Sequence, residues 1–306
     1  MTGSTPNASV LELAVAQTPS FFSLWGGEND VLGYATTGGD GTNPITPVSG
    51  VPGVGFDGSY GALIATLTAG GAQGVVANIP NVLNIPHFTT VPHNPVPLDA
   101  ATAAAVNGAY IPYNGGLQAA FGALAGTGLF TQEELDARTI SFVEGANNAV
   151  VIEDETLTDL GAINPAFAAL PKIRQATADD LLVLPAASFI GTLAVEGNPL
   201  TVNGVAIPLA DKWVLLPSEQ EEITAATEAF NQIIAATASQ AGLAFVDANS
   251  LLNQLANGGI TSGQFTLTSS LVTGSAFSLD GIHPTARGYA LLANEFMKAI
   301  DVTYGS

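Results

Sequence analysis

Residues 21–30 read Phe-Phe-Ser-Leu-Trp-Gly-Gly-Glu-Asn-Asp, an apolar run that changes abruptly into a glycine-rich polar turn. The apolar run predicts a short strand buried on both faces, because it lacks the alternation of a half-exposed strand. In open α/β sheets ligands bind beyond the carboxyl ends of the strands, and Gly27-Glu28-Asn29-Asp30 occupies that position. This stretch therefore predicts a buried strand and the loop that works at its end.

An amphipathic helix followed by a short apolar strand occurs three times along the chain. The helices are expected over Ser9 to Gln17, around Leu63, Ile64 and Leu67, and from Pro217-Ser218 onward, and the strands over 21–25, 74–79 and 243–247. Ser9 with Glu12, and Ser218 with Glu221, have the spacing of a capping box at a helix start. Buried strands separated by helices indicate an α/β fold with a parallel sheet covered by helices.

The rest of the chain follows this rhythm only in part. A last helix from about Thr285 to Ile300 is expected to close the domain, with Tyr289, Leu292, Ala293, Phe296 and Ile300 on its inner stripe. Residues 34–57 are expected to form a long loop. Between Pro92 and about Leu216 the pattern breaks, although Thr131 marks a helix start and residues 149–152 and 181–184 are strand-like. We expect a single domain over 1–306 with an insertion or lid at 95–215.

Composition limits the function classes that fit this chain. The 306 residues include 26 acidic and 6 basic residues, which gives a net charge of −20. Such a surface repels phosphate backbones, so nucleic-acid binding is not expected. No stretch reaches the roughly 18 uninterrupted apolar residues of a membrane span. The absence of cysteine excludes disulfides, thiolate metal sites and a cysteine nucleophile.

Asp280-Gly281-Ile282-His283-Pro284 lies immediately before the last expected helix. An Asp three residues ahead of a His, on a turn that contains glycine and proline, can place its carboxylate against the imidazole Nδ1. Nε2 is then free to act as a general base, with its tautomer fixed. The alternative is an ordinary Asp-Gly turn before a helix, and only geometry decides between the two.

Gly27-Glu28-Asn29-Asp30 carries a second kind of chemistry. The amide of Asn29 can donate a hydrogen bond to a developing oxyanion, and Gly27 allows close approach of the backbone. The alternative is a plain Gly/Asn turn.

Taken together, the two motifs resemble those of the SGNH (GDSL-type) hydrolase family. Residues 22–30 look like its third conserved block, residues 280–284 look like its fifth, and residues 74–80 resemble the strand that follows the third. The resemblance implies a flavodoxin-like three-layer α/β/α sandwich and acyl-ester hydrolysis of the esterase or lipase kind, with no metal and no cofactor. It implies that His283 is the base, that Asp280 orients it, and that Asn29 and Gly27 belong to the oxyanion hole.

The family's nucleophile is the serine of a Gly-Asp-Ser block on the first strand, upstream of the Gly-x-Asn-Asp block. Only 26 residues precede Gly27, and their serines, Ser4, Ser9, Ser20 and Ser23, do not follow Gly-Asp. Asp57-Gly58-Ser59-Tyr60-Gly61 is neither this block nor a nucleophile elbow, and Ser59 is expected to start a helix. We therefore expect that the nucleophile is not on this chain, that the first strand or strands are missing, and that the chain alone is inactive.

Two functions follow from this expectation. The first is an ester hydrolase of which this chain is a C-terminal portion, and the second is a non-catalytic binding or surface module that keeps the fold. The expected partner is a small-molecule or lipid ester, and an open sheet edge would favour self-association. Residues 1–6 contain no basic n-region or apolar h-region of an export signal, whereas the family implies an extracellular or cell-envelope location.

Three other features have ordinary explanations. His87 and His93 have no clustered carboxylate, so no metal site is expected there. Residues 153–155 are expected to form a solvated acidic patch. Trp25 and Trp213 are expected to be core or strand residues.

Overall fold

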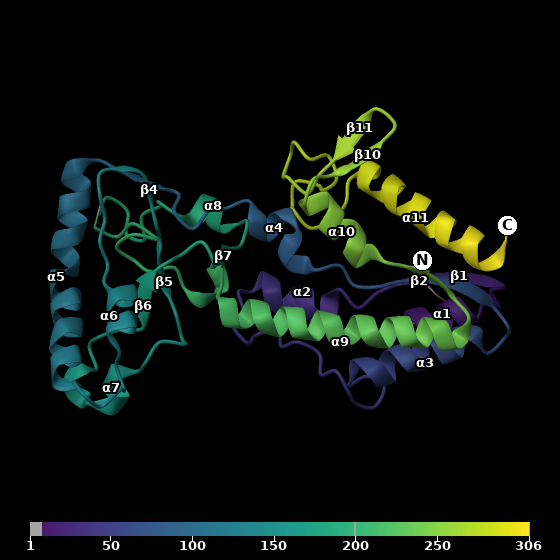
Figure 1. Ribbon diagram of the computed structural model, residues 1–306, viewed down its shortest axis with the longest axis horizontal. Helices are drawn as coiled ribbons and strands as arrows, with labels where there is room; N and C mark the ends of the chain where they lie inside the picture. Colours follow the sequence, from purple (N-terminus) through teal and green to yellow (C-terminus); the bar gives the residue numbers. More distant parts are fainter. Residues whose placement is uncertain (1–7, 199, 306) are drawn as a thin grey trace. The chain divides into compact units, whose positions relative to one another are not determined.

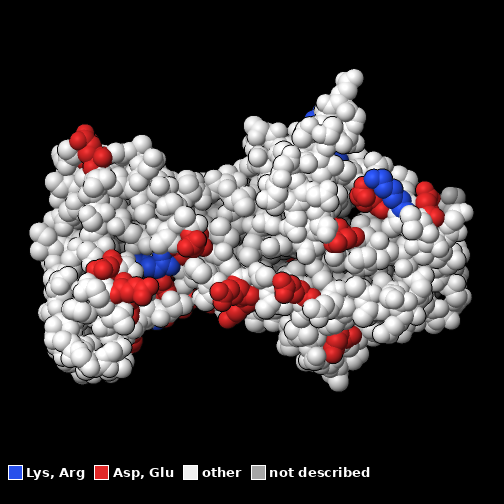
Figure 2. Space-filling view, in the orientation of Figure 1, with Lys and Arg blue, Asp and Glu red and all other residues white. Residues whose placement is uncertain are grey.

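The computed structural model describes residues 8–198 and 200–305 of the chain. The chain divides into two compact units. The first unit consists of Met1–Ala35, Asn43–His87 and Gln220–Ser306, and the second consists of Thr36–Thr42 and Phe88–Glu219. None of the described helices is both long enough and apolar enough to cross a membrane. On the face drawn in Figure 2, acidic side chains are scattered singly and in small groups, and basic ones are few.

The first unit is built on a three-stranded parallel sheet. Its strands are β1 (Phe21–Trp25), β2 (Gln73–Ala77) and β9 (Ala244–Val246), in the order β1-β2-β9. The carboxyl ends are in register, since Trp25 is opposite Ala77 and Ala77 is opposite Val246. The predicted α/β class and parallel sheet are therefore confirmed. Among the described strands, β1 pairs only with β2, so its other edge is open.

Helices cover both faces of this sheet (Figure 1). On one face, α11 (Ala286–Tyr304) packs Phe296, Ala299, Ile300 and Tyr304 against Val75, Ala77, Ala244 and Val246. On the other face lie α3 (Phe56–Thr68) and α9 (Pro217–Ala241), where the rings of Phe56 and Phe230 stack with centroids 4.1 Å apart. The predicted inner stripe of the last helix is wrong at Tyr289 and Ala293, which are exposed, because its contacts with the sheet come from its second half.

The first unit also contains several shorter elements, in whole or in part. They are α1 (Val10–Val15), α2 (Asn29–Thr36), η1 (Val82–Asn84), α4 (Pro86–Thr89), α10 (Ala248–Ala256) and the hairpin of β10 (Ile260–Ser262) and β11 (Phe265–Leu267). The capping box of Ser9 and Glu12 is confirmed at the start of α1. The one predicted at Ser218 is wrong, because α9 begins at Pro217 and Ser218 already lies in its first turn. The start predicted at Ser59 is wrong for the same kind of reason, since α3 begins at Phe56.

The second unit combines helices with short antiparallel strand pairs. Its elements are β3 (Val96–Leu98), α5 (Ala100–Ala123), α6 (Gln132–Arg138), β4 (Gly145–Asn148), β5 (Val151–Glu153), α7 (Leu160–Ile163), η2 (Pro165–Phe167), β6 (Ile173–Gln175), β7 (Leu181–Leu182), α8 (Ala186–Phe189), η3 (Asp211–Trp213) and β8 (Val214–Leu215). One core cluster joins Leu117, Ala120, Leu124, Phe130, Leu135 and Leu160. The helix start predicted at Thr131 is confirmed, because Thr131 caps α6.

The second unit contains a buried ion network. Arg174 donates to Asp154 at 2.6 Å and to both carboxylate oxygens of Asp180 at 2.7 Å. Asp154 is only 3% exposed, so the prediction of a solvated acidic patch over 153–155 is wrong at its central residue. Since a buried charge is tolerated only when it is paired, Arg174 explains the burial of Asp154.

Candidate active site

The turn that carries His283 is held at the start of α11. Thr285 caps this helix, its hydroxyl accepting from the backbone N–H of Gly288. Gly281 has a φ of 71°, and a Cβ at this position would lie 2.7 Å from the backbone nitrogen of His87. The backbone N–H of His87 also donates to the carbonyl of Gly281 at 3.1 Å. Only glycine fits this position, which fixes the path of the chain between Asp280 and His283.

Asp280 and His283 form the pair that the sequence predicts. The Nδ1 atom of His283 lies 2.7 Å from Oδ2 of Asp280. The other oxygen, Oδ1, accepts from the hydroxyl of Ser278 at 2.6 Å and from the backbone N–H groups of Ile282 and His283 at 2.9 and 3.0 Å. Partial burial opposes ionisation of Asp280, but these hydrogen bonds outweigh it and hold the pKa of the carboxyl well below its ordinary value. An ionised Asp280 therefore orients the imidazole and leaves Nε2 available.

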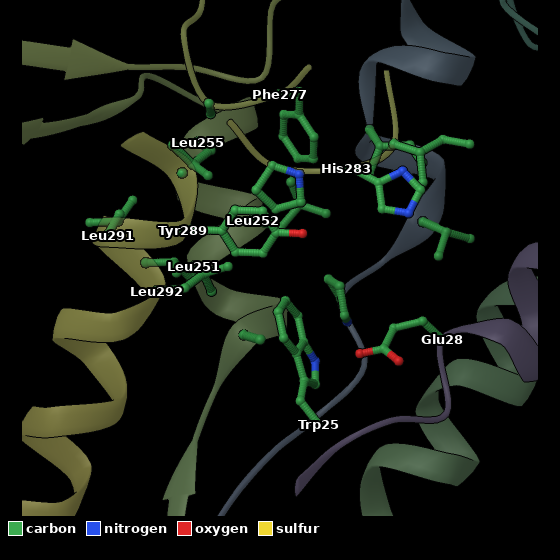
Figure 3. A pocket seen from close by; sticks show the side chains of 18 of the residues that line it. Trp25, Glu28, Leu251, Leu252, Leu255, Phe277, His283, Tyr289, Leu291 and Leu292 are labelled. Atoms are coloured by element: carbon green, nitrogen blue, oxygen red, sulfur yellow. The ribbon is translucent and has the colours of Figure 1, made fainter. Parts of the chain in front are cut away.

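The imidazole opens onto a pocket in the first unit (Figure 3). The side chain of His283 is 70% exposed, and the pocket has a volume of about 260 Å³. Most of its lining is apolar and comes from α10, α11 and the loops beside them, with Leu251, Leu252, Leu255, Phe277, Leu291 and Leu292 as the larger members. The polar residues of the lining are Glu28, Asn29, His283 and Tyr289. An imidazole oriented by Asp280 thus faces a cavity that suits an apolar ligand.

The second motif reaches the same pocket. Glu28 and Asn29 follow β1 directly, and both line the cavity. Gly27 lies outside the lining, and its φ of 114° and a Cβ position only 2.8 Å from Ile79 explain why glycine is present. Burial raises the pKa of the Glu28 carboxyl, with a smaller contribution from the negative charge of Asp30. Asn29 is exposed at the first residue of α2, where its amide can donate to a ligand.

Two contributors to this site were not predicted. Ser278, two residues before Asp280, fixes the carboxylate, and the hydroxyl spacing Ser-x-Asp was the signal that could have revealed it. Trp25 lines the pocket while its Nε1 donates to the carbonyl of Asn78 at 3.2 Å, so it is more than a core residue.

No serine of the described residues is hydrogen-bonded to Nε2 of His283. Ser9 caps α1, Ser23 lies within β1, and the hydroxyl of Ser59 donates to the carbonyl of Gly55 at 2.7 Å. Ser20 comes just before β1, and Ser4 lies outside the described residues. Among the described residues, the imidazole of His283 is paired with Asp280, and no serine hydroxyl is hydrogen-bonded to its Nε2 atom.

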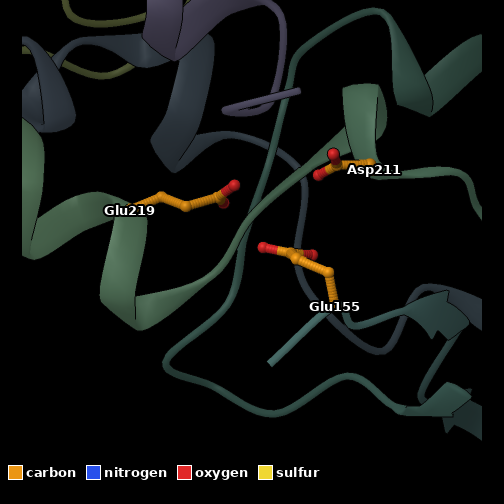
Figure 4. A group of neighbouring side chains, drawn as sticks. All are labelled: Glu155, Asp211 and Glu219. Atoms are coloured by element: carbon orange, nitrogen blue, oxygen red, sulfur yellow. The ribbon is translucent and has the colours of Figure 1, made fainter. Parts of the chain in front are cut away.

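A second group of acids lies in the second unit (Figure 4). Carboxylate oxygens of Glu155, Asp211 and Glu219 all lie within 4.8 Å of one another. Burial and the charges of Glu155, Asp40 and Glu153 raise the pKa of Asp211 to about 6. Oxygen ligands of this kind suit Ca²⁺ or Mg²⁺, but acidic groups are also common without a metal.

The two histidines with ordinary explanations are not part of any such group among the described residues. His87 is buried in the first unit, and its Nδ1 lies 3.3 Å from the carbonyl oxygen of Asp280. Burial lowers the pKa of the His87 imidazole. His87 thus holds the turn that carries His283 through its contacts with Gly281 and Asp280.

Comparison of the chain with protein-family models, with curated proteins and with solved structures gives no match.

Proposed function

We propose that the pocket of the first unit is the acyl-transfer site of an ester hydrolase of the SGNH type. The observation that carries the proposal is the 2.7 Å contact of His283 with Asp280 beside a pocket that also contains Asn29. These residues come from opposite ends of the chain, and a chance turn at either end would not require the other. The same proposal assigns a flavodoxin-like core to the first unit and an inserted subdomain to residues 95–215.

In this proposal each polar residue has one task. A serine hydroxyl attacks the ester carbonyl while Nε2 of His283 accepts its proton, and the imidazolium returns that proton to the departing alkoxide. Asp280 stabilises the imidazolium through Nδ1. The amide of Asn29 donates to the oxyanion of the tetrahedral intermediate, whereas Gly27, outside the lining, keeps only a backbone role in the turn. A water molecule then repeats the sequence on the acyl-serine and releases the carboxylic acid.

The proposal takes the serine from another polypeptide segment, because no serine of the described residues is hydrogen-bonded to Nε2 of His283, and the open edge of β1 could accept such a segment. A strand that pairs in parallel with β1 would have its carboxyl end beside Trp25, which is the last residue of β1. Its carboxyl end would therefore lie next to the loop of Glu28 and Asn29. Exposed backbone groups at such an edge favour the addition of a strand. A second copy of the chain is the competing occupant of this edge.

The test uses the genomic sequence upstream of codon 1, read in frame and joined to the chain. We expect the extended protein to hydrolyse p-nitrophenyl butyrate, and His283→Ala to reduce kcat by a factor of about 10³ or more. The 306-residue chain itself should give only the background rate. Hydrolysis by the unextended chain that disappears in His283→Ala would show that the nucleophile is already present.

A second candidate is a non-catalytic binding module, and it is favoured because no hydroxyl of the described residues is hydrogen-bonded to Nε2 of His283. A stop codon directly upstream in the reading frame, or an extended protein that has no esterase activity, would decide for the module.

A further inference from the structure

The pocket beside His283 has two unlike sides. Figure 3 shows Glu28 and His283 on one side and Leu251, Leu291 and Leu292 on the other. The lining contains neither Lys nor Arg, and its polar residues are too few to satisfy a sugar or another ligand rich in hydroxyl groups. An aliphatic chain can fill the leucine side without leaving polar groups unpaired.

Glu28 is the one acidic residue of the lining. No ion pair of Glu28 is present among the described residues, and the buried hydroxyl of Tyr60 near it has no hydrogen-bond partner there. Burial raises the pKa of the Glu28 carboxyl, as expected for an acid without a neighbouring cation. A second negative charge in this pocket would meet both an apolar wall and an uncompensated acid.

We propose that this pocket holds the uncharged aliphatic acyl chain of the substrate, and that Glu28 excludes chains that carry a negative charge. This inference rests on the ester hydrolase function proposed above, because it places the ester carbonyl on the side of His283. The chain then lies along the leucines of α10 and α11. The net charge of −20 also repels anionic ligands, as Glu28 does within the pocket.

Binding is measurable without hydrolysis, because Trp25 lines the pocket and Trp213 is the only other tryptophan. Trp213→Phe leaves Trp25 as a single fluorescent reporter. We titrate this variant with n-butanol, n-hexanol and n-octanol, and with butanoate, hexanoate and octanoate, at about pH 8, where the free acids are ionised. Each methylene that enters the apolar side should lower the Kd of the alcohols about fourfold. Octanoate should bind at least about tenfold more weakly than octanol.

Three variants separate the pocket from the rest of the molecule. Leu251→Gln and, independently, Leu292→Gln keep the size of half-buried lining residues and should weaken octanol binding about tenfold. Leu193→Gln, at an exposed leucine of the second unit, is the matched control and should leave the Kd for octanol unchanged. Circular dichroism identifies any variant that fails to fold. Glu28→Gln should narrow the ratio between octanoate and octanol several-fold.

Each result has a defined meaning. A Trp25 signal without chain-length dependence, or octanol binding that survives both leucine variants, overturns the acyl pocket. An unchanged octanoate-to-octanol ratio in Glu28→Gln overturns the role of Glu28. Binding as expected, combined with an extended protein that hydrolyses no ester, overturns the proposed function and leaves the pocket intact.

Discussion

The two units each contain an aspartate with a shifted pKa, and the shifts have opposite directions. The pKa of Asp280, in the His283 turn of the first unit, is lowered, whereas the pKa of Asp211, in the acidic group of the second unit, is raised. Asp280 receives hydrogen bonds from Ser278, Ile282 and His283. Asp211 has a buried Oδ1 atom without a hydrogen-bond partner among the described residues, and its neighbours are acids. Both are aspartates near other polar groups, so the number of donors around the carboxylate decides the direction.

The largest effect is expected at Asp280. In the extended, serine-containing protein, Asp280→Asn should lower kcat for p-nitrophenyl butyrate by a factor of about 10³ to 10⁴, because the amide favours the wrong imidazole tautomer. Asp211→Asn is the matched control and should leave kcat unchanged. An equal loss of kcat in the two variants would contradict a specific catalytic role for the carboxylate of Asp280.

A smaller effect is expected at Ser278. Ser278→Ala removes the 2.6 Å hydrogen bond to Oδ1, so the pKa of Asp280 should rise toward its ordinary value. The carboxyl ¹³C chemical shift of Asp280, followed as a function of pH, measures this change in the 306-residue chain. Ser278→Thr keeps a hydroxyl and should restore the low pKa. A pKa that stays low in Ser278→Ala would mean that the two backbone donors suffice.

The smallest effect is expected at Asp211, and it concerns stability. Because its pKa is raised from 3.8 to about 6, the folded state holds this proton more tightly than the unfolded state. The resulting stabilisation is complete below about pH 4 and is lost as the pH rises through about 6. After allowance for solvent screening of a half-exposed group, Asp211→Asn should raise the free energy of unfolding at pH 8 by about 1 kcal/mol, with a Tm about 2 °C higher.

Urea unfolding at pH 4 and at pH 8 tests this expectation. The gain in Asp211→Asn should be present at pH 8 and absent at pH 4, whereas the exposed Glu144→Gln should give no gain at either pH. A gain of the same size at both pH values would assign the effect to packing instead of charge.

Local sequence patterns predicted those helices and strands of the first unit that depend only on residues close together in the chain. The apolar runs at 21–25 and 74–79 correspond to β1 and to most of β2, so the strands themselves were predicted. Burial on both faces is confirmed for β2 from Gly74 to Ala77 but is wrong for β1, where Phe22 is buried and Phe21 and Ser23 are exposed, because β1 is an edge strand of the described sheet. The Ser9 capping box formed because its partners are three residues apart. The prediction failed at Ser218, where Pro217 already begins the helix, and at Asp154, whose burial depends on Arg174 twenty positions away.

The sequence by itself determined the parallel α/β core and the Asp280–His283 contact, because these follow from hydrophobic periodicity and from a three-residue spacing across a glycine turn. Only the tertiary structure decided that Asn29 and His283 share one pocket, that α10 and α11 supply its leucine side, and that Asp211 meets Glu155 and Glu219. These contacts join residues far apart in the chain. Their geometry depends on the packing of whole elements, which local patterns do not encode.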